Sequence, residues 1–104
     1  MADPRMVRMA EIEVVPDQLD AYKALLTEEI AASLEREPGV LMLHAVSLQS
    51  DPTHIRLLEV YASPEAYEAH IQTAHFRKYK TGTAAMVKAL RLIELDPILL
   101  AAKP

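Results

Sequence analysis

The spacing of apolar residues along this chain switches between the strand period and the helix period, and the order of these switches limits the folds open to it. Residues 6–15 alternate between apolar and polar positions, which predicts a strand. Residues 17–37 predict an amphipathic helix, because apolar residues recur every three or four positions. The members of this stripe are Leu19, Tyr22, Leu26, Ile30 and Leu34. Three further apolar segments, 40–49, 54–62 and 90–95, predict strands.

Turn and capping residues set the borders between these segments. A Pro-Gly pair at 38–39 ends the first helix, and a turn at 50–53 joins the second and third strands as an antiparallel hairpin. Ser63, followed by Pro64, predicts the start of a second helix. We expect Thr73-Ala74 to interrupt that helix, and a second helical piece to carry Phe76, Tyr79, Thr83, Val87 and Leu90. The resulting order predicts an α+β, ferredoxin-like β-α-β-β-α-β sandwich, with both helices on one face of a four-stranded sheet.

Length and composition predict one soluble domain spanning residues 1–104. Hydrophobic residues make up 51% and charged residues 25%, and the net charge of −4 argues against nucleic acid or an acidic membrane as a partner. The chain lacks cysteine, which excludes disulfides, thiolate metal sites and a cysteine nucleophile, and fits a reducing cytoplasm. We expect neither a membrane span nor a signal peptide, because the longest uncharged run, 38–50, is shorter than the roughly 20 residues a spanning helix needs.

Three of the predicted strands are apolar at consecutive positions, so both of their faces are apolar. These positions are Val40-Leu41-Met42-Leu43, Leu57-Leu58 and Leu92-Ile93. A sheet with helices on one face only is expected to expose polar residues on the other. We therefore predict that a second copy covers this face, in a two-fold homodimer with sheet against sheet. The candidate contact positions are Leu41, Leu43, Leu57 and Leu58.

Four histidines are candidates for chemistry, because imidazole titrates near neutral pH. His70 is predicted on the apolar side of the second helix, and His75 lies at its interruption. His44 shares one predicted sheet face with Val40, Met42, Val46 and Leu48, whereas His54 at the hairpin turn is expected to be solvated. Each of the first three is either a hydrogen-bonded core residue or part of a catalytic cavity. No metal site is expected, since His70 and His75 would lie about 140° apart on an unbroken helix.

Glu59 is unusual because it lies inside an apolar strand. Such a carboxylate either pairs with a cation, for which Arg8 and Arg91 are candidates, or has a raised pKa. Other side chains either fill the core or form the walls of a pocket for an aromatic substrate. These are Tyr67, Phe76 and Met42.

The segment Glu59–Phe76, EVYASPEAYEAHIQTAHF, resembles the signature of the antibiotic biosynthesis monooxygenase domain. That signature reads E-x-[WY]-x-s-x-e-a-x-x-x-H-x-x-[ST]-x-H-[FYM], and its most specific positions here are His70, His75 and Phe76. The segments 10–14 and 37–40 are also similar to this family, so the resemblance spans nearly the whole chain.

The resemblance implies a dimeric α+β barrel and a cofactor-independent monooxygenase, which uses no flavin, haem or metal. Its substrate would be a small aromatic compound, a quinol or polycyclic phenol, which itself supplies the electrons to O₂ once a phenolic proton is removed. His70 would be the general base or hold the substrate oxygen, and His75 would orient it or bind the second oxygen. The substrate-binding candidates are His44, Phe76, Tyr67, Met42 and Glu59.

The family also includes relatives with other chemistry. Haem degradation is not expected, because the chain has neither the Asn nor the Trp that those relatives need, and Lys80 stands at their haem-ligand position. An isomerase of a small hydroxyketone or a phosphorylated signalling sugar, using the same histidines, is an alternative, although the pocket segments lack an obvious basic cluster for a phosphate. A ligand-binding dimer without turnover is a third.

Overall fold

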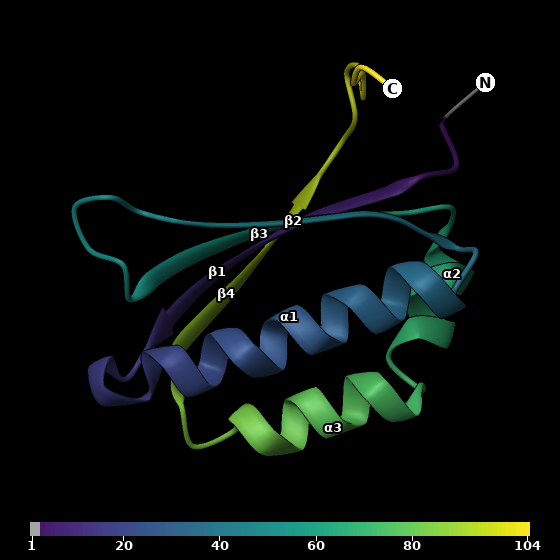
Figure 1. Ribbon diagram of the computed structural model, residues 1–104. Coiled ribbons are helices and arrows are strands. Elements are labelled where there is room, and N and C mark those ends of the chain that lie inside the picture. Colours follow the sequence, from purple (N-terminus) through teal and green to yellow (C-terminus); the bar gives the residue numbers. More distant parts are fainter. Residues whose placement is uncertain (1–2) are drawn as a thin grey trace.

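The computed structural model describes residues 3–104, in which a four-stranded sheet is covered by helices on one face (Figure 1). The elements are β1 (Met6–Val14), the 3-10 helix η1 (Pro16–Gln18), α1 (Leu19–Arg36), β2 (Val40–Ser47), β3 (His54–Tyr61), α2 (Pro64–His70), α3 (Ala74–Thr83) and β4 (Val87–Leu95). The strands lie in the order β2-β3-β1-β4, and each neighbouring pair is antiparallel. The predicted α+β, ferredoxin-like fold is therefore confirmed.

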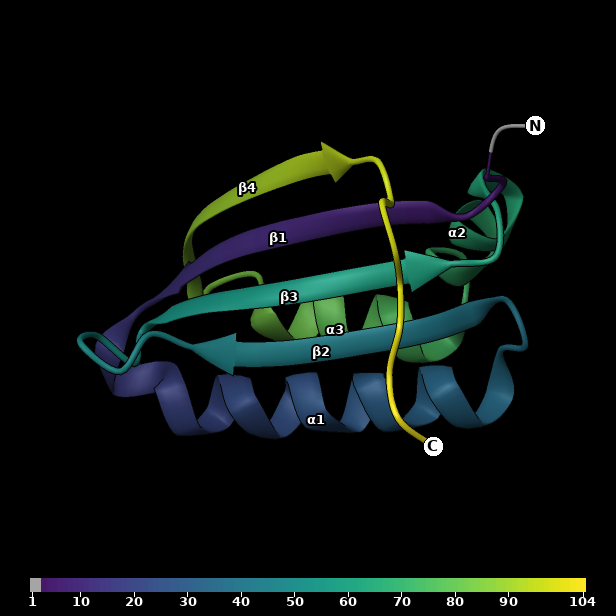
Figure 2. The same ribbon diagram turned by 90° about the horizontal axis from the view of Figure 1, so that it is seen from above.

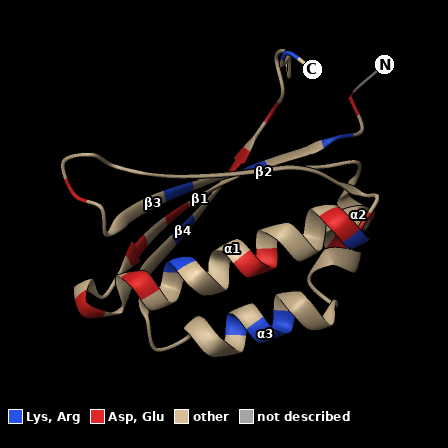
Figure 3. Cartoon of the chain, viewed as in Figure 1, with Lys and Arg blue, Asp and Glu red and all other residues tan. Residues whose placement is uncertain are grey.

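The helices form a single layer beneath the sheet. Seen from above, the strands lie over α1 and α3, and within residues 3–104 no helix covers the upper face (Figure 2). Basic residues gather on α3 beside acidic residues of α1 (Figure 3). One pair joins the two helices directly, since Lys78 Nζ lies 2.5 Å from Glu28 Oε1. The helix layer is thus tied together at its solvent side as well as through the core.

The buried face of α1 differs from the predicted one in its C-terminal half. Tyr22 and Leu26 are buried as predicted, but the stripe continues through Glu29 and Ser33. Leu34 was predicted in the stripe and is instead 47% exposed, because it lies about 100° around the helix from Ser33. The two buried polar side chains satisfy one another, since Ser33 Oγ lies 2.7 Å from Glu29 Oε1. A carboxylate is thereby placed in the interior, facing the sheet.

The second helical piece ends earlier than its apolar spacing predicts. α3 ends at Thr83, and the backbone N–H of Met86 donates to the Thr83 carbonyl at 2.9 Å to close a turn. Val87 and Leu90 lie in β4, so the prediction that they are helical was wrong. The reason is non-local, because residues 87–95 gain a full ladder of pairing with β1.

A β-bulge in β2 changes which of its residues face the helices. The pairing with β3 shifts between Val40 and Met42, which leaves Leu41 as an extra residue. Val40 and Leu43 are both buried in the core, whereas Met42 and His44 point to the opposite face of the sheet. The prediction that Val40 shares a face with Met42 and His44 was therefore wrong, because one inserted residue reverses the alternation.

The sheet face away from the helices is apolar over one half. Strand pairing brings six residues together there, which we call the outer patch: Met9, Met42, His44, Leu58, Ile93 and Leu95. Farther along the strands this face becomes charged, where Arg56 and Arg91 both contact Glu11. Of the predicted contact positions, Leu58 lies in this patch, but Leu43 and Leu57 face the helices in the core.

The chain beyond β4 rises away from the sheet and is largely exposed (Figure 1). Its apolar residues Ile98 and Leu99 make almost no cover for the outer patch, because both are exposed. Among the described helices, none combines the length and the hydrophobicity that a membrane span requires.

Candidate functional site

A short turn between α2 and α3 brings two histidines to the same point. Ser63 caps α2 as predicted, and the helix ends at His70. Thr73 then serves both helices, because its Oγ1 donates to the His70 carbonyl at 2.8 Å and accepts from the Phe76 N–H at 3.2 Å. The chain restarts as α3 in a new direction, so the ring of His75 lies 6.3 Å from that of His70, centroid to centroid.

Glu37, in the turn after α1, binds both histidines with one oxygen. Its Oε2 lies 2.9 Å from His70 Nδ1 and 2.6 Å from His75 Nε2. Burial opposes the charge of this carboxylate, but the two imidazole bonds outweigh burial and hold the pKa of Glu37 below its usual value. Because an ionised carboxylate only accepts hydrogen bonds, both of these ring nitrogens donate. The nitrogens left free for chemistry are His70 Nε2 and His75 Nδ1.

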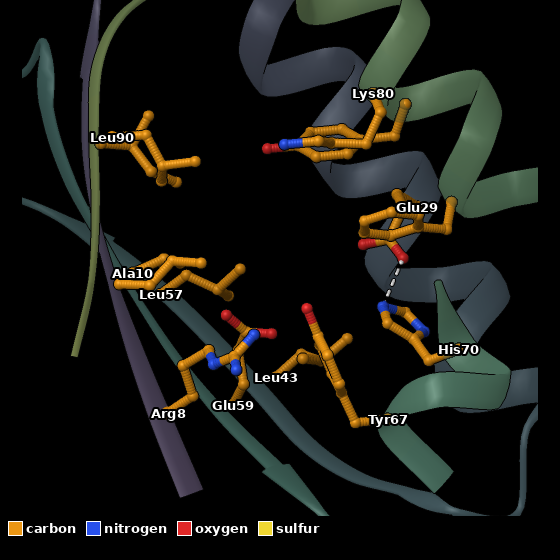
Figure 4. A pocket seen from close by; sticks show the side chains of 14 residues that line it. Arg8, Ala10, Glu29, Leu43, Leu57, Glu59, Tyr67, His70, Lys80 and Leu90 are labelled. Atoms are coloured by element: carbon orange, nitrogen blue, oxygen red, sulfur yellow. Dashed lines mark ion pairs between the residues drawn. The ribbon is translucent and has the colours of Figure 1, made fainter. Parts of the chain in front are cut away.

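Glu29 of α1 lies on the other side of the His70 ring (Figure 4). Its Oε1 is 3.4 Å from His70 Nε2, and both side chains are almost wholly buried, at 4% and 2% exposure. Carboxylates and imidazoles are rarely buried to this extent without a partner. His70 is therefore held between two carboxylates, one on each ring nitrogen.

A cavity of about 90 Å³ lies between the helices and the sheet, and His70 forms part of its wall. Aromatic and aliphatic side chains form most of the lining, among them Leu43, Leu57, Tyr67, Phe76 and Tyr79. Leu90 and Leu92 of β4 also line it and are 46% and 49% exposed, so the mouth lies along β4. Arg8 enters from β1 and Lys80 from α3, which places two cations at the same cavity (Figure 4).

Glu59 of β3 is a buried carboxyl group that faces this cavity. Burial raises its pKa, and the bond from the Tyr61 hydroxyl and the charge of Arg8 offset this only in part. The predicted ion pairs of Glu59 do not form, because Arg8 Nε binds Glu94 Oε1 at 2.6 Å and Arg91 lies against Glu11. The second possibility, a carboxyl group with a raised pKa, describes Glu59.

Most of the predicted site residues gather at the cavity, but two do not. His70, Phe76, Tyr67 and Glu59 line it, and His75 stands directly behind His70. Met42 and His44 lie in the outer patch, on the opposite face of the sheet, because of the β2 bulge. Within one chain these two residues are not part of the cavity, and Leu43 takes the place predicted for Met42.

Two carboxylates at the centre of the site were missed by the sequence reasoning. Glu29 and Glu37 continue the buried stripe of α1 with Ser33, at steps of four residues. That spacing was a usable signal, because a Glu at a core position of an amphipathic helix requires a partner. The identity of the partners was not visible, since α2 and α3 approach from more than thirty positions away.

Comparison with known proteins shows the family of this chain. The model of the antibiotic biosynthesis monooxygenase family matches residues 5–82, which is most of the chain. The chain belongs to the antibiotic biosynthesis monooxygenase family. A search among curated proteins found no match to it.

Solved structures of this family agree with the fold. A Bacteroides thetaiotaomicron protein named for the same family shares 45% sequence identity, with a TM-score of 0.94, and the match covers 100% of this chain and 99% of that one. A monooxygenase-named protein from Lactobacillus acidophilus is 26% identical, with a TM-score of 0.85 over 90% of this chain and 51% of that one. A family member from Nitrosomonas europaea is 22% identical, with a TM-score of 0.87 over 94% of each chain, and shows the fold alone.

Proposed function

We propose that this protein is a cofactor-independent monooxygenase that oxidises a quinol or related phenol with O₂. The observation that carries the proposal is the setting of His70: its Nδ1 lies 2.9 Å from Glu37 Oε2, its Nε2 lies 3.4 Å from Glu29 Oε1, and its ring forms part of the cavity wall. An imidazole held in one orientation by a carboxylate is suited to act as a general base, because the carboxylate stabilises the imidazolium that forms.

In the proposed reaction, His70 Nε2 takes the phenolic proton. The phenolate is a stronger reductant than the phenol, so it passes one electron to O₂, and the two radicals then combine at a ring carbon. The hydroperoxide formed there loses water and leaves a carbonyl group. A hydroquinone and O₂ thus give a hydroxyquinone and water, with every electron supplied by the substrate. The carboxyl group of Glu29 lies 3.4 Å from the same nitrogen, beside the imidazolium that forms.

The cavity limits how much of the substrate is enclosed. Its volume of about 90 Å³ is smaller than the ~150 Å³ apolar cavity that holds benzene in an engineered protein. One hydroxyl-bearing edge of a ring fits beside His70, with Phe76 and Tyr67 as walls, and the remainder lies toward Leu90 and Leu92 at the mouth. This favours a quinol of one ring, or the terminal ring of a larger phenol.

His75 acts in this proposal as a positioning residue. It shares Glu37 Oε2 with His70 and does not itself line the cavity. Its N–H bond to Glu37 keeps that oxygen in place, so that the Nδ1–H of His70 has a fixed acceptor. Loss of His75 is expected to make the orientation of His70 less fixed, while His70 itself remains as the base.

A homodimer is part of the proposal. The outer patch offers Met9, Leu58 and Ile93 in one row across the sheet, with no cover from residues 3–104 apart from the edge of the C-terminal segment. A second copy, packed sheet against sheet around a two-fold axis, is the simplest cover for such a surface.

A second candidate function has one observation in its favour. Arg8 and Lys80 line the cavity together, although no basic cluster was evident in the sequence. Two cations beside a histidine base also suit an isomerase of an anionic hydroxyketone, such as a sugar phosphate, in which His70 would move a proton between carbons.

Oxygen consumption separates these functions. The protein, treated with EDTA and free of flavin, is incubated with a panel of one-ring and two-ring quinols under ¹⁸O₂. The monooxygenase predicts oxygen uptake above the spontaneous rate and one ¹⁸O atom in the product. An isomerase converts its hydroxyketone without O₂, and a ligand-binding dimer shows binding but neither reaction. Either of these two results overturns the proposal.

A further inference from the structure

His70 Nε2 and Glu29 Oε1 lie 3.4 Å apart, and both groups are almost wholly buried. The other ring nitrogen of His70, Nδ1, lies 2.9 Å from Glu37 Oε2, so Nε2 is the nitrogen that remains for a further partner. A proton or a metal cation between a ring nitrogen and a carboxylate oxygen satisfies both groups at this separation.

His75 adds a third possible metal ligand to Glu29 and His70. One ligand atom each from Glu29, His70 and His75 lies within 4.8 Å of the other two. The edge of a tetrahedron around Zn²⁺ is about 3.4 Å for bonds near 2.1 Å. The Glu29–His70 separation already has this value, and the His75 ligand atom, which lies within 4.8 Å of the other two, needs to approach by at most about 1.4 Å.

The surroundings of these donors also match a metal centre. Glu37 contacts one ring nitrogen of each histidine, as carboxylates behind metal-bound imidazoles do. The expectation that His70 and His75 cannot face one ion assumed an unbroken helix, and the turn at 71–73 removes that assumption.

We infer that Glu29, His70 and His75 bind one Zn²⁺ ion, and that the ion inhibits the protein by occupying His70 Nε2. Two imidazoles and one carboxylate suit Zn²⁺, whereas Mg²⁺ prefers oxygen ligands in an octahedron. The fourth position of the ion would face the cavity, since His70 and Glu29 both line it. Zn²⁺ binding stands independently of the proposed function, and only the inhibition rests on it.

Calorimetric titration of the EDTA-treated, dialysed protein with Zn²⁺ tests the binding. We expect one ion per chain with a Kd in the micromolar range or below, and no heat with Mg²⁺. E29Q and H75Q each remove a ligand and are expected to weaken binding at least 10²-fold, while E37Q weakens it about 10- to 100-fold. H54Q is the matched control, because His54 lies near Asp51 and Glu13 in a separate exposed cluster.

The results have distinct meanings. Zn²⁺ binding that survives both E29Q and H75Q, or that H54Q abolishes, overturns the inference, as does a lack of binding by the folded wild-type protein. H75Q protects the test against misfolding, since His75 lies at the rim of the cluster and its loss leaves the bond of His70 to Glu37. Circular dichroism checks each variant.

The inhibition is measured separately as oxygen uptake with one equivalent of Zn²⁺. We expect at least a tenfold fall that EDTA reverses, and an unchanged rate would overturn the inhibitory role. If the protein consumes no oxygen with any quinol, the proposed function fails while the calorimetric result still decides whether the ion binds.

Discussion

Each face of the sheet carries a group of residues that is unusual for its position. Between the inner face and the helices lie the buried side chains of Glu29, Glu59 and His70. The outer patch, around Leu58 and Met9, is apolar and has no helix over it within residues 3–104. A soluble monomer normally exposes the first kind of residue and buries the second.

This difference indicates that the inner face serves chemistry and the outer face serves contact with another protein surface. Burial of a charged group costs several kcal/mol unless a partner offsets it, and a core built for stability alone would use apolar residues there. On the inner face, His70 contacts Glu29 and Glu37 beside a cavity, an arrangement that suits chemistry on a small molecule. The outer patch carries no such pairing beyond its charged end, and its composition is typical of a protein interface.

The largest expected effect comes from removing the base on the inner face. H70A is expected to lower kcat for quinol oxidation by roughly 10²- to 10⁴-fold, because it removes the proposed general base. It also leaves Glu37 with His75 alone, so we expect a loss of about 1–3 kcal/mol in the free energy of unfolding. Oxygen uptake per folded molecule, with folding measured by urea titration, separates the two effects.

H54A is the control for that variant, since His54 lies at the hairpin turn, away from the cavity. We expect it to keep wild-type kcat. Full activity of H70A per folded molecule would contradict the role of His70 as the base and leave it as a structural residue.

The next largest effect concerns the outer patch. L58E places a charge in the row Leu58–Met9–Ile93, where a partner sheet is expected to exclude water. Sedimentation equilibrium of the wild-type protein should give twice the chain mass, and L58E should give the mass of one chain. T27E, on the exposed side of α1, should remain dimeric. A wild-type protein that sediments as a monomer would show that the outer patch has another purpose.

The fold was predictable because its signals are local. A few adjacent residues determine each signal: the cap at Ser63, the helix break at Thr73 and the change of apolar spacing at each border. The order of these signals along the chain predicts the ferredoxin-like topology. The site was less predictable because it depends on contacts between distant segments. The contacts of Glu37 with α2 and α3 join residues more than thirty positions apart. The β2 bulge was not predictable either, because the extra residue is a leucine, which is not typical of a bulge.

Gly39 lies close to α2, two residues after Glu37 in the sequence. Its replacement is expected to have a moderate effect on stability. A Cβ at this position would lie 2.6 Å from Ala66 Cβ, so α2 must shift away from the turn that carries Glu37. We expect G39A to destabilise the protein by about 1–3 kcal/mol, because the packing has no room for the methyl group. G82A is the matched control, because its Cβ meets only the flexible end of Leu25 and alanine favours the helix. Equal stability of G39A and wild type in urea titration would contradict this account.

The smallest expected effect concerns the stability cost of Glu59 on the inner face. Burial raises the pKa of its carboxyl group above the usual value of 4.5, so the folded state holds this proton more tightly than the unfolded state does. Between the unfolded and the folded pKa the native protein binds more protons, and its stability therefore falls as pH rises through that window. The contribution is fully present below pH 4.5 and lost above the folded pKa.

E59Q removes this titration and keeps an oxygen that accepts the Tyr61 hydroxyl. We therefore expect E59Q to be more stable than wild type at pH 8, by on the order of 1 kcal/mol, and the difference to shrink toward pH 4.5. Urea titrations at both pH values measure it. L58Q, one residue away but on the outer patch, should show no such pH dependence, because it exchanges one uncharged side chain for another. If E59Q is less stable than wild type at pH 8, Glu59 is ionised and paired in the folded protein. Its negative charge then does not lower the free energy of unfolding.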